Sequence, residues 1–261
     1  MDVRLDGRRA LITGGSQGLG LATAKRFADS GADVAIVARR EETLAEAKSA
    51  IEAVSSRGRV EAFSCDVSDA TSLADMYAKA EVAFGGIDVV VNNAGSSVSG
   101  AFEDMTDEIW QHDLDLKLFA AIRLARLALP GMKQRRWGRI INVLNIGARA
   151  PAAAGAPTHV SRAAGLALTK VLAGDGAPHN VLCNALLIGV ISTEQIKRRY
   201  DREAPDMSLQ EFIAERGKRV PIGRMGEAEE FANMACFLAS EQGSFISGTA
   251  INVDGNMSPV I

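Results

Sequence analysis

A glycine-rich stretch near the start of the chain has the spacing of a phosphate-binding turn. Gly14, Gly18 and Gly20 follow a short apolar run at residues 10–12 and open a helical pattern. Glycine permits a tight turn and lets backbone N–H groups approach a pyrophosphate at a helix N-terminus, where the helix dipole favours anions. Because the stretch comes directly after a strand pattern, a dinucleotide-binding turn is favoured over a glycine turn of structural use only.

The end of the second apolar run bears on which dinucleotide is bound. The run at residues 34–37 is followed by Ala38, Arg39 and Arg40. An acid at this point commonly holds the ribose hydroxyl of NAD, and no carboxylate stands here to repel a 2′-phosphate. The planar guanidinium of Arg39 could clamp such a phosphate, so NADP(H) is favoured over NAD(H). The alternative is that both arginines are simply solvated.

The elements that must position these residues follow from the hydrophobic pattern. Short runs that are apolar throughout are typical of strands covered on both faces. Their alternation with helical patterns predicts right-handed crossovers and an α/β fold, a Rossmann-like doubly wound parallel sheet with helices on both faces. The expected strands are 10–12, 34–37, 60–63, 89–91, 140–143, 181–186 and 249–253, and the expected helices lie near 18–29, 41–55, 71–84, 107–131, 157–176 and 227–239.

The composition limits the partners of this fold. The 261 residues are 47% hydrophobic, and 29 basic residues nearly balance 32 acidic ones. Without a basic stripe, nucleic-acid binding is not expected, and no apolar stretch reaches the roughly 20 residues of a membrane helix. Three scattered cysteines and three scattered histidines, with no secretory signal, predict reduced thiols, a cytoplasmic location and no metal site.

One segment departs from the alternation of strand and helix patterns. No Pro/Ser-rich linker or repeat divides residues 1–261, so we expect one dinucleotide-binding domain. Within it, residues 194–220 are charged, contain Pro205 and lack an obvious strand. A long excursion of this kind often covers a substrate site, and a plain surface insertion is the alternative. The sequence predicts a candidate lid here and leaves both possibilities open.

Several motifs together resemble the short-chain dehydrogenase/reductase family over essentially the full chain. They are residues 13–20, the segment Asn92-Asn93-Ala94-Gly95 and residues 245–255. The resemblance implies an NAD(P)-dependent oxidoreductase for a carbonyl or alcohol group of a small molecule, and a homo-oligomer, either a tetramer or a dimer. It also implies that the cofactor is bound by Gly14, Ser16, Gln17, Gly18, Leu19, Gly20, Arg39, Asp66, Val67, Asn93, Ala94, Gly95, Arg162, Gly189, Ile191 and Thr193.

Four positions of this resemblance hold residue types that the family does not use for its reaction. The family relies on a Ser, a Tyr and a Lys with a supporting Asn, and the matching places read Asn145, Thr158, Arg162 and Asp115. Hydride transfer to a carbonyl creates an alkoxide that needs a proton, which a tyrosine of lowered pKa supplies. A threonine hydroxyl is a far weaker acid, and arginine keeps its proton. Polarisation of a carbonyl is expected to survive, but efficient proton transfer is not.

Three other residues could replace the missing proton donor. His159 has a suitable intrinsic pKa, but as the neighbour of Thr158 it should point to another side. Asp115 could relay a proton through water, and Tyr200 could swing inward from the candidate lid. Each of them is also an ordinary surface or helix residue in the simpler interpretation.

These observations leave functions of different classes open. The first is an NADP(H)-binding oxidoreductase with atypical catalytic residues. The alternative is a catalytically inactive cofactor-binding protein, either a nucleotide sensor or a non-catalytic subunit of a mixed oligomer. Non-redox chemistry at a site lined by Arg162 and Asp115 is a third hypothesis. Cofactor binding with or without turnover discriminates the first two, and the residues around the site do not predict a particular substrate.

Overall fold

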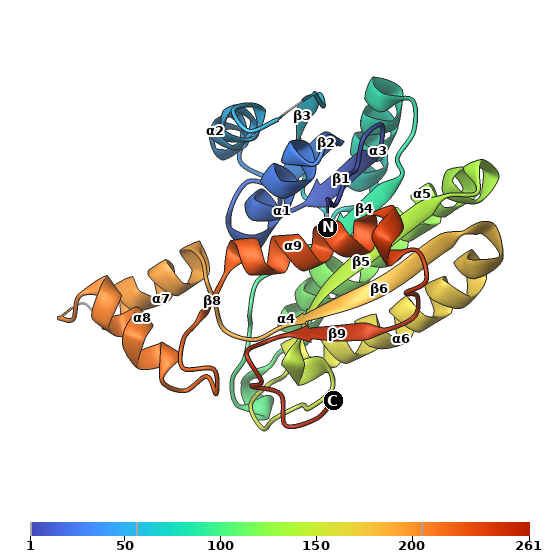
Figure 1. Cartoon of the computed structure of the whole chain (residues 1–261). Coiled ribbons are helices and arrows are strands. Elements are labelled where there is room, and N and C mark those ends of the chain that lie inside the picture. The colour runs from blue at the N-terminus through green and yellow to red at the C-terminus, as the bar shows by residue number, and fades with distance from the viewer. Residues whose placement is uncertain (1, 56, 205) are drawn as a thin grey trace.

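A seven-stranded sheet forms the centre of the molecule (Figure 1). The computed structural model describes residues 2–55, 57–204 and 206–261. The strand order is β3-β2-β1-β4-β5-β6-β9, and every neighbouring pair is parallel, which confirms the predicted doubly wound α/β fold. The strands are β1 Arg9–Thr13, β2 Asp33–Ala38, β3 Val60–Ser64, β4 Val89–Asn92, β5 Gly138–Asn145, β6 Val181–Ile188 and β9 Ala250–Val253.

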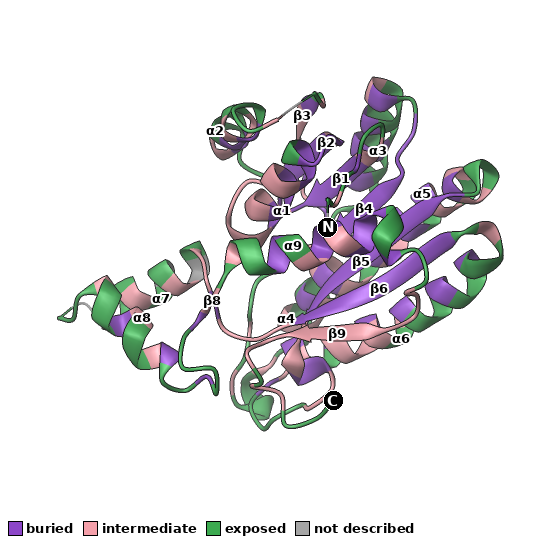
Figure 2. Cartoon of the chain, in the orientation of Figure 1, coloured by how far each residue is buried: buried purple, intermediate pink, exposed green. Residues whose placement is uncertain are grey.

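Helices cover both faces of the sheet, and each face has its own hydrophobic core. Ala10 and Ile12 of β1 belong to one core, whereas Leu11 between them belongs to the other. This explains why the strands are apolar throughout, and Figure 2 shows the inner strands as buried. One face carries α1 (Gly18–Asp29), α2 (Glu41–Glu52) and α9 (Ala228–Ala239), and the other carries α3 (Ala70–Phe84), α5 (Ala120–Arg135) and α6 (Thr158–Gly176).

The helix expected near 107–131 is three elements rather than one. It consists of α4 (Asp107–Leu114), a π-helical turn η2 (Asp115–Phe119) and α5. The prediction of one regular helix was therefore wrong, because the apolar pattern continues through the π turn and gives no sign of the extra residue. A π turn rotates the residues after it relative to those before it, and such turns occur frequently at functional sites.

The candidate lid is a pair of helices that projects from one side of the sheet (Figure 1). The pair consists of α7 (Glu194–Glu203) and α8 (Leu209–Gly217), and Pro205 between them lies outside the described residues. The rings of Tyr200 and Phe212 pack edge to face with centroids 5.6 Å apart. Short strands β7 (Ile191–Ser192) and β8 (Gly226–Glu227) pair at its base, and the short helices elsewhere are η1 Phe102–Asp104, η3 Ile146–Ala148, η4 Ala177–His179 and η5 Glu241–Gly243.

None of the described helices has both the length and the apolar character needed to cross a membrane.

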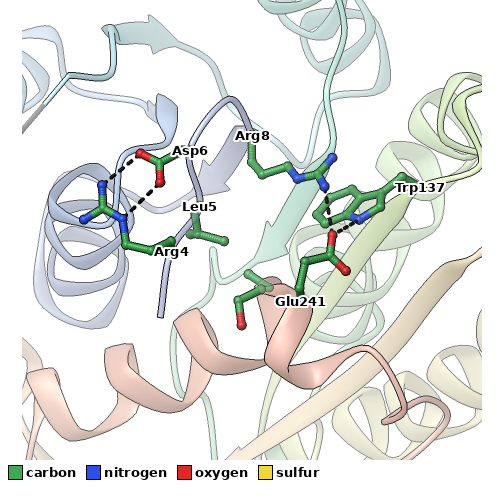
Figure 3. A pocket seen from close by; sticks show the side chains of 8 residues that line it. Arg4, Leu5, Asp6, Arg8, Trp137 and Glu241 are labelled. Atoms are coloured by element: carbon green, nitrogen blue, oxygen red, sulfur yellow. Dashed lines mark hydrogen bonds and ion pairs between the residues drawn. The ribbon is translucent and has the colours of Figure 1, made fainter. Parts of the chain in front are cut away.

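A cluster around Trp137 ties together the amino ends of β1 and β5 (Figure 3). The guanidinium carbons of Arg8 and Arg139 lie 3.6 Å and 4.3 Å from the centroid of the Trp137 ring. Glu241, which follows α9, accepts hydrogen bonds from Arg8 at 2.8 Å and from Trp137 Nε1 at 2.7 Å. A cavity of about 170 Å³ lies beside this cluster. Because ligands of doubly wound sheets bind at the carboxyl ends of the strands, this cavity is on the wrong edge for the predicted site.

Candidate active site

The glycine-rich turn lies where the winding of the sheet changes direction. β1 is paired with β2 on one side and with β4 on the other, so a crevice forms at their carboxyl ends. Asn93 Nδ2 donates to the carbonyl oxygens of Thr13 at 2.9 Å and Gly14 at 3.2 Å. The backbone N–H of Asn93 donates to Thr13 Oγ1 at 3.0 Å. These bonds fix the turn after β1 relative to the end of β4.

Two glycines of this turn are required by its geometry. Gly18 has a φ of +54°, in the left-handed region that favours glycine, and a Cβ at Gly20 would lie 2.1 Å from the carbonyl oxygen of Gly14. Helix α1 begins at Gly18 with no acidic residue in its first turn and no cap from the Gln17 side chain. A bare helix N-terminus of this kind fits a pyrophosphate, so the cradle suits the dinucleotide that the sequence predicts.

The turns after β2 and β3 provide the residues expected at the adenosine end of the cofactor. Asp66 Oδ1 accepts hydrogen bonds from the Ser68 hydroxyl at 2.6 Å and the Ser68 N–H at 3.0 Å. Burial opposes ionisation of Asp66, but these bonds and the charge of Arg39 outweigh it and lower the pKa of Asp66. Arg39 is exposed, whereas Arg40 donates to Gln17 Oε1 at 3.1 Å. The side chain of Arg39 is thus presented at the edge of the crevice.

A buried cluster of charged and hydroxyl groups joins α4, the π turn and the start of α6. Lys117 Nζ donates to Thr158 Oγ1 at 2.8 Å and also to Asp113 Oδ1, and both charged side chains are only 1% exposed. Ser161 Oγ donates to the other oxygen of Asp113 at 2.6 Å. Thr158 Oγ1 donates to the carbonyl oxygen of Val98 at 2.7 Å and accepts from the Val98 N–H at 3.0 Å. Every side-chain oxygen of Thr158 and Asp113 is therefore engaged.

The surroundings of Lys117 make its ammonium group a better acid than an exposed lysine. Burial lowers the pKa of Lys117 to about 8. The hydrogen bond that Lys117 donates to Asp113 opposes this shift, and the positive charge of Arg162 adds to it. At neutral pH the group is therefore mostly protonated, yet it can release its proton. A pKa near the working pH is what general acid–base catalysis needs.

Arg162 lies next to this cluster, below the Gly95 backbone. Its Nη1 donates to the carbonyl oxygen of Val143 at 2.6 Å. A Cβ at Gly95 would lie 2.7 Å from Arg162 Nη2, so the glycine makes room for the guanidinium. Burial lowers the pKa of Arg162 to about 10, which still leaves the group positively charged at neutral pH. A fixed cation therefore lies between the end of β4 and the proton-bearing cluster.

Two further predicted residues face the crevice from other elements. Asn145 ends β5, and its Oδ1 is buried without a hydrogen-bond partner among the described residues. A buried amide of this kind is suited to a polar ligand, because an unsatisfied buried polar atom is costly. Thr193 approaches the glycine turn: its Cβ lies 3.5 Å from the position of a Cβ on Gly18. The segment after β6 thus closes over the cradle from above.

Comparisons with known proteins agree with this geometry. Residues 14–258 match the family described as "Enoyl-(Acyl carrier protein) reductase". The monensin polyketide synthase putative ketoacyl reductase of Streptomyces virginiae is 33% identical over 257 residues, which cover 96% of this chain and 97% of the relative. The chain belongs to the short-chain dehydrogenase/reductase family.

Solved structures of this family superpose over the full chain. The L-sorbose reductase of Gluconobacter frateurii, complexed with NADPH and L-sorbose, has a TM-score of 0.93 and 33% identity, and covers 100% of both chains. A short chain oxidoreductase of Pseudomonas aeruginosa PAO1, described as containing an atypical catalytic center, has a TM-score of 0.91 and 33% identity over 99% of both chains in its NADPH-bound form. The chain is thus an oxidoreductase of the short-chain dehydrogenase/reductase type, and the non-catalytic alternative is not favoured.

In this short-chain dehydrogenase/reductase the residue beside Thr158 is Lys117, not Asp115. Asp115 accepts hydrogen bonds from Arg123 at 3.0 Å and from Gln111 at 2.8 Å instead. Residues two apart on a helix do not share a face, so a side chain at 115 is directed away when 117 points inward. The structure thus brings Lys117 to Thr158, whereas Asp115, which the sequence analysis assigned to the fourth position, contacts Arg123 and Gln111.

The other candidate proton donors are engaged elsewhere. His159 Nδ1 accepts from the Ala152 N–H at 3.2 Å, and its ring packs against Gly155 rather than toward Thr158. Tyr200 donates its hydroxyl to the Met207 carbonyl oxygen at 2.8 Å, inside the helix pair. The sequence analysis missed Lys117, Asp113 and Ser161. The signal available for the first two was their spacing, because an acid and a lysine four residues apart share one helix face.

Proposed function

We propose that this protein interconverts a carbonyl compound and its alcohol with NADP(H), and that Lys117 and Thr158 handle the proton. The observation that carries the proposal is the distance of 2.8 Å between Lys117 Nζ and Thr158 Oγ1. A threonine hydroxyl alone is a poor acid, but one that is hydrogen-bonded to an ammonium group can pass a proton on. The proton-handling function of the missing tyrosine is thereby divided between two side chains.

The proposed relay keeps the proton count balanced. When bound, the nicotinamide would supply a hydride to the carbonyl carbon. A substrate oxygen that replaces the Val98 carbonyl as acceptor receives the hydroxyl proton of Thr158, and Lys117 delivers one of its own protons to Thr158 Oγ1. Lys117 ends as a neutral amine beside Asp113, and solvent restores its proton. In the oxidation direction the same transfers run backwards.

Arg162 and Asn145 complete the proposed site without exchanging protons. Arg162 stays charged at neutral pH and would hydrogen-bond the ribose of the cofactor, as the family resemblance implies for this position. The Oδ1 of Asn145 lacks a partner among the described residues, so it can accept a hydrogen bond from a hydroxyl group of the substrate. This contact would orient the alcohol form of the substrate beside Thr158.

NADP(H) rather than NAD(H) is the proposed cofactor. The turn after β2 has Ala38, Arg39 and Arg40 and no carboxylate to oppose a 2′-phosphate. Arg39 is exposed at the edge of the crevice, where its guanidinium can form charge-assisted hydrogen bonds to a phosphate. The two solved relatives with bound NADPH support the same preference.

The remaining expectations concern the whole protein. We propose that residues 1–261 act as one domain, with the helix pair α7–α8 as a lid for a small-molecule substrate. A homo-oligomer, tetramer or dimer, is supported by the exposed Phe245 and Ile261 near the edge strand β9, because apolar groups beside a sheet edge favour association. The three buried free cysteines support a cytoplasmic location.

The decisive experiment combines binding with turnover. Affinities for NADPH and NADH are measured by calorimetry, and NADPH oxidation is followed with a panel of ketones, aldehydes and keto acids. We expect tighter binding of NADPH and measurable turnover with at least one class. Lys117→Met should lower kcat by about 10²- to 10⁴-fold, the usual contribution of a general acid, while NADPH affinity changes little.

Two further variants show whether a loss of activity in Lys117→Met comes from the missing proton donor or from a disturbed fold. Lys117→Met leaves Asp113 buried without its cation, so Asp113→Asn/Lys117→Met, which removes both charges, is made in parallel. Lys79→Gln, at an exposed lysine of α3, is the matched control and should keep full activity. Undiminished kcat in a folded Lys117→Met protein would refute the proton pathway. NADPH binding without turnover across the panel would favour the non-catalytic alternative.

A further inference from the structure

The first residue of α7 reaches the phosphate turn at the other end of the chain. Glu194 Oε2 lies 3.7 Å from the position that a Cβ on Gly18 would occupy, and the Thr193 methyl lies 3.6 Å from the same point. Gly18 begins α1, and Glu194 begins α7. A carboxylate from the candidate lid therefore rests beside the turn that would receive the cofactor pyrophosphate.

The electrostatic potential at the start of α1 favours a negatively charged group there. The N-terminus of α1 has a partial positive charge, yet its own first turn contains no acidic residue. Glu194 is exposed, and the nearby cations Arg199 and Arg216 are paired with Glu203 instead. Its carboxylate therefore lies close to the positive end of α1, where an anionic ligand is also favoured. A pyrophosphate bound at this turn would carry the same sign of charge.

We infer that Glu194 is a displaceable occupant of the pyrophosphate position, which NADP(H) must drive away in order to bind. The inference rests on the proposed cofactor and adds a device that lowers its affinity and links it to the lid. Since Glu194 is the first residue of α7, its departure moves the start of that helix. Tyr200 packs on Phe212, and Glu203 is paired with Arg216 at 2.7 Å, so a shift of α7 is transmitted to α8.

An occupant that is present only in the free protein has a distinct kinetic effect. It stabilises the cofactor-free state and must leave before the dinucleotide docks, so its removal raises the association rate constant. The dissociation rate constant is unchanged, because the bound complex no longer contains the contact. Simple repulsion inside the complex would have the opposite signature, with slower dissociation after the charge is removed.

The test compares Glu194→Gln with Asp201→Asn, which removes an exposed charge from the same helix. NADPH association and dissociation are followed by stopped-flow fluorescence, and inorganic pyrophosphate serves as a competitor. We expect Glu194→Gln to accelerate NADPH association by about three- to tenfold and to tighten pyrophosphate binding similarly, the range expected for a carboxylate at a helix N-terminus. Asp201→Asn should leave both values near those of the unmodified protein.

The outcomes separate this inference from the proposed function. If NADPH binds and Glu194→Gln behaves like Asp201→Asn, the inference is wrong while the cofactor assignment stands. A gain found entirely in slower dissociation also overturns it. If neither NADPH nor NADH binds to the unmodified protein or to Glu194→Gln, the cofactor assignment fails and the inference fails with it. Thermal unfolding of the variants confirms that the substitutions leave the fold intact.

Discussion

At the scale of single residues, the proposed proton relay depends on how Lys117 is surrounded. A solvated lysine has a pKa near 10.4 and would release its proton too slowly to assist hydride transfer at neutral pH. Burial of Lys117 lowers that pKa, and the charge of Arg162 lowers it further. Asp113 acts in the other direction and keeps the ammonium form populated. Thr158 takes part because its oxygen contacts Lys117, not because of any acidity of its own.

The pKa of Lys117, about 8, predicts the pH dependence of the reaction. Reduction needs the ammonium form, so its rate should be constant below pH 8 and fall above it. Oxidation needs the neutral amine and should instead rise through the same pH and then level off. Values of kcat/KM for the substrate, measured in both reaction directions between about pH 6 and about pH 10 with saturating cofactor, test both predictions. Two limbs that move in the same direction with pH would contradict the assignment of Lys117.

Asp113→Asn provides a test with a predicted sign. The carboxylate of Asp113 raises the pKa of Lys117, so its neutral counterpart should lower that pKa and move the break in the reduction profile to lower pH. The loss of a buried ion pair should also destabilise the fold by about 3 kcal/mol. Urea unfolding measures the stability, and the pH–rate profile is read at temperatures where the variant is folded. A break that moves to higher pH would mean that another group titrates.

Some of this site could be predicted from the sequence and some could not. The glycine turn was predictable because Gly18 and Gly20 are needed by backbone geometry that no other residue satisfies. The position of Lys117 was predictable only in part. Its spacing of four residues from Asp113 indicates that the two share a helix face, but periodicity in a single sequence does not reveal the π turn that contains Lys117. Thr158 and Arg162 both lie on the regular helix α6, so periodicity alone predicts that they share a face.

At the scale of elements, the π turn between α4 and α5 allows one helical segment to serve two purposes. Asp113 comes from α4, ahead of the turn, and Lys117 lies within the turn, and both reach Thr158 of α6. Asp115 from the same turn is held by Arg123 on the following helix. The turn therefore separates the pair proposed to handle the proton from the ion pair of Asp115 with Arg123.

The alternation of strands and helices predicted the architecture well for a physical reason. Strands covered on both faces carry mostly apolar side chains, so the middle parts of β1, β2 and β4 (residues 10–12, 34–38 and 89–91) appear as short apolar runs. The candidate lid was harder to predict, because α7 is strongly charged and its helical form depends on packing against α8. Charged segments of this kind give the same pattern whether they are helices or irregular loops.

Two glycines of similar sequence context should respond in opposite ways to alanine. Gly20→Ala places a Cβ 2.1 Å from the Gly14 carbonyl oxygen, so the turn must shift. We expect a loss of about 1–3 kcal/mol in stability, as for other overpacked sites, and at least about tenfold weaker NADPH binding. Gly174→Ala, on an exposed position of α6 with nothing within 4 Å, should stabilise by about 0.5–1 kcal/mol. Thermal unfolding with and without NADPH measures both effects, and equal responses would argue against the close approach at Gly20.

At the scale of the whole molecule, the two ends of the sheet have different roles. The carboxyl ends of β1, β4 and β5 converge on the glycine turn, Asn93 and Asn145, which face the crevice. The amino ends are closed by the cluster of Arg8, Trp137 and Glu241 (Figure 3). The cofactor is proposed to bind at one edge of the sheet, and the cluster at the opposite edge stabilises the fold. We therefore expect that stability and activity can be altered independently.

Glu241 offers a test of this separation. Arg139 is 1% exposed, with Nε and Nη2 lacking hydrogen-bond partners among the described residues, and Glu241 at 3.8 Å is an acid that offsets its charge. Glu241→Ala also removes the acceptor for Trp137 Nε1 and Arg8, so we expect a loss of about 1–2 kcal/mol, limited by the solvent exposure of Glu241. The melting temperature should fall by a few degrees, roughly 2–4 °C per kcal/mol for a chain of this length.

NADPH affinity and kcat of Glu241→Ala should be unchanged at temperatures well below the transition. Glu229→Ala, at an exposed acid of α9, serves as the control. Weaker NADPH binding in folded Glu241→Ala would show that the two edges of the sheet are coupled, because no direct contact connects this cluster to the glycine turn among the described residues.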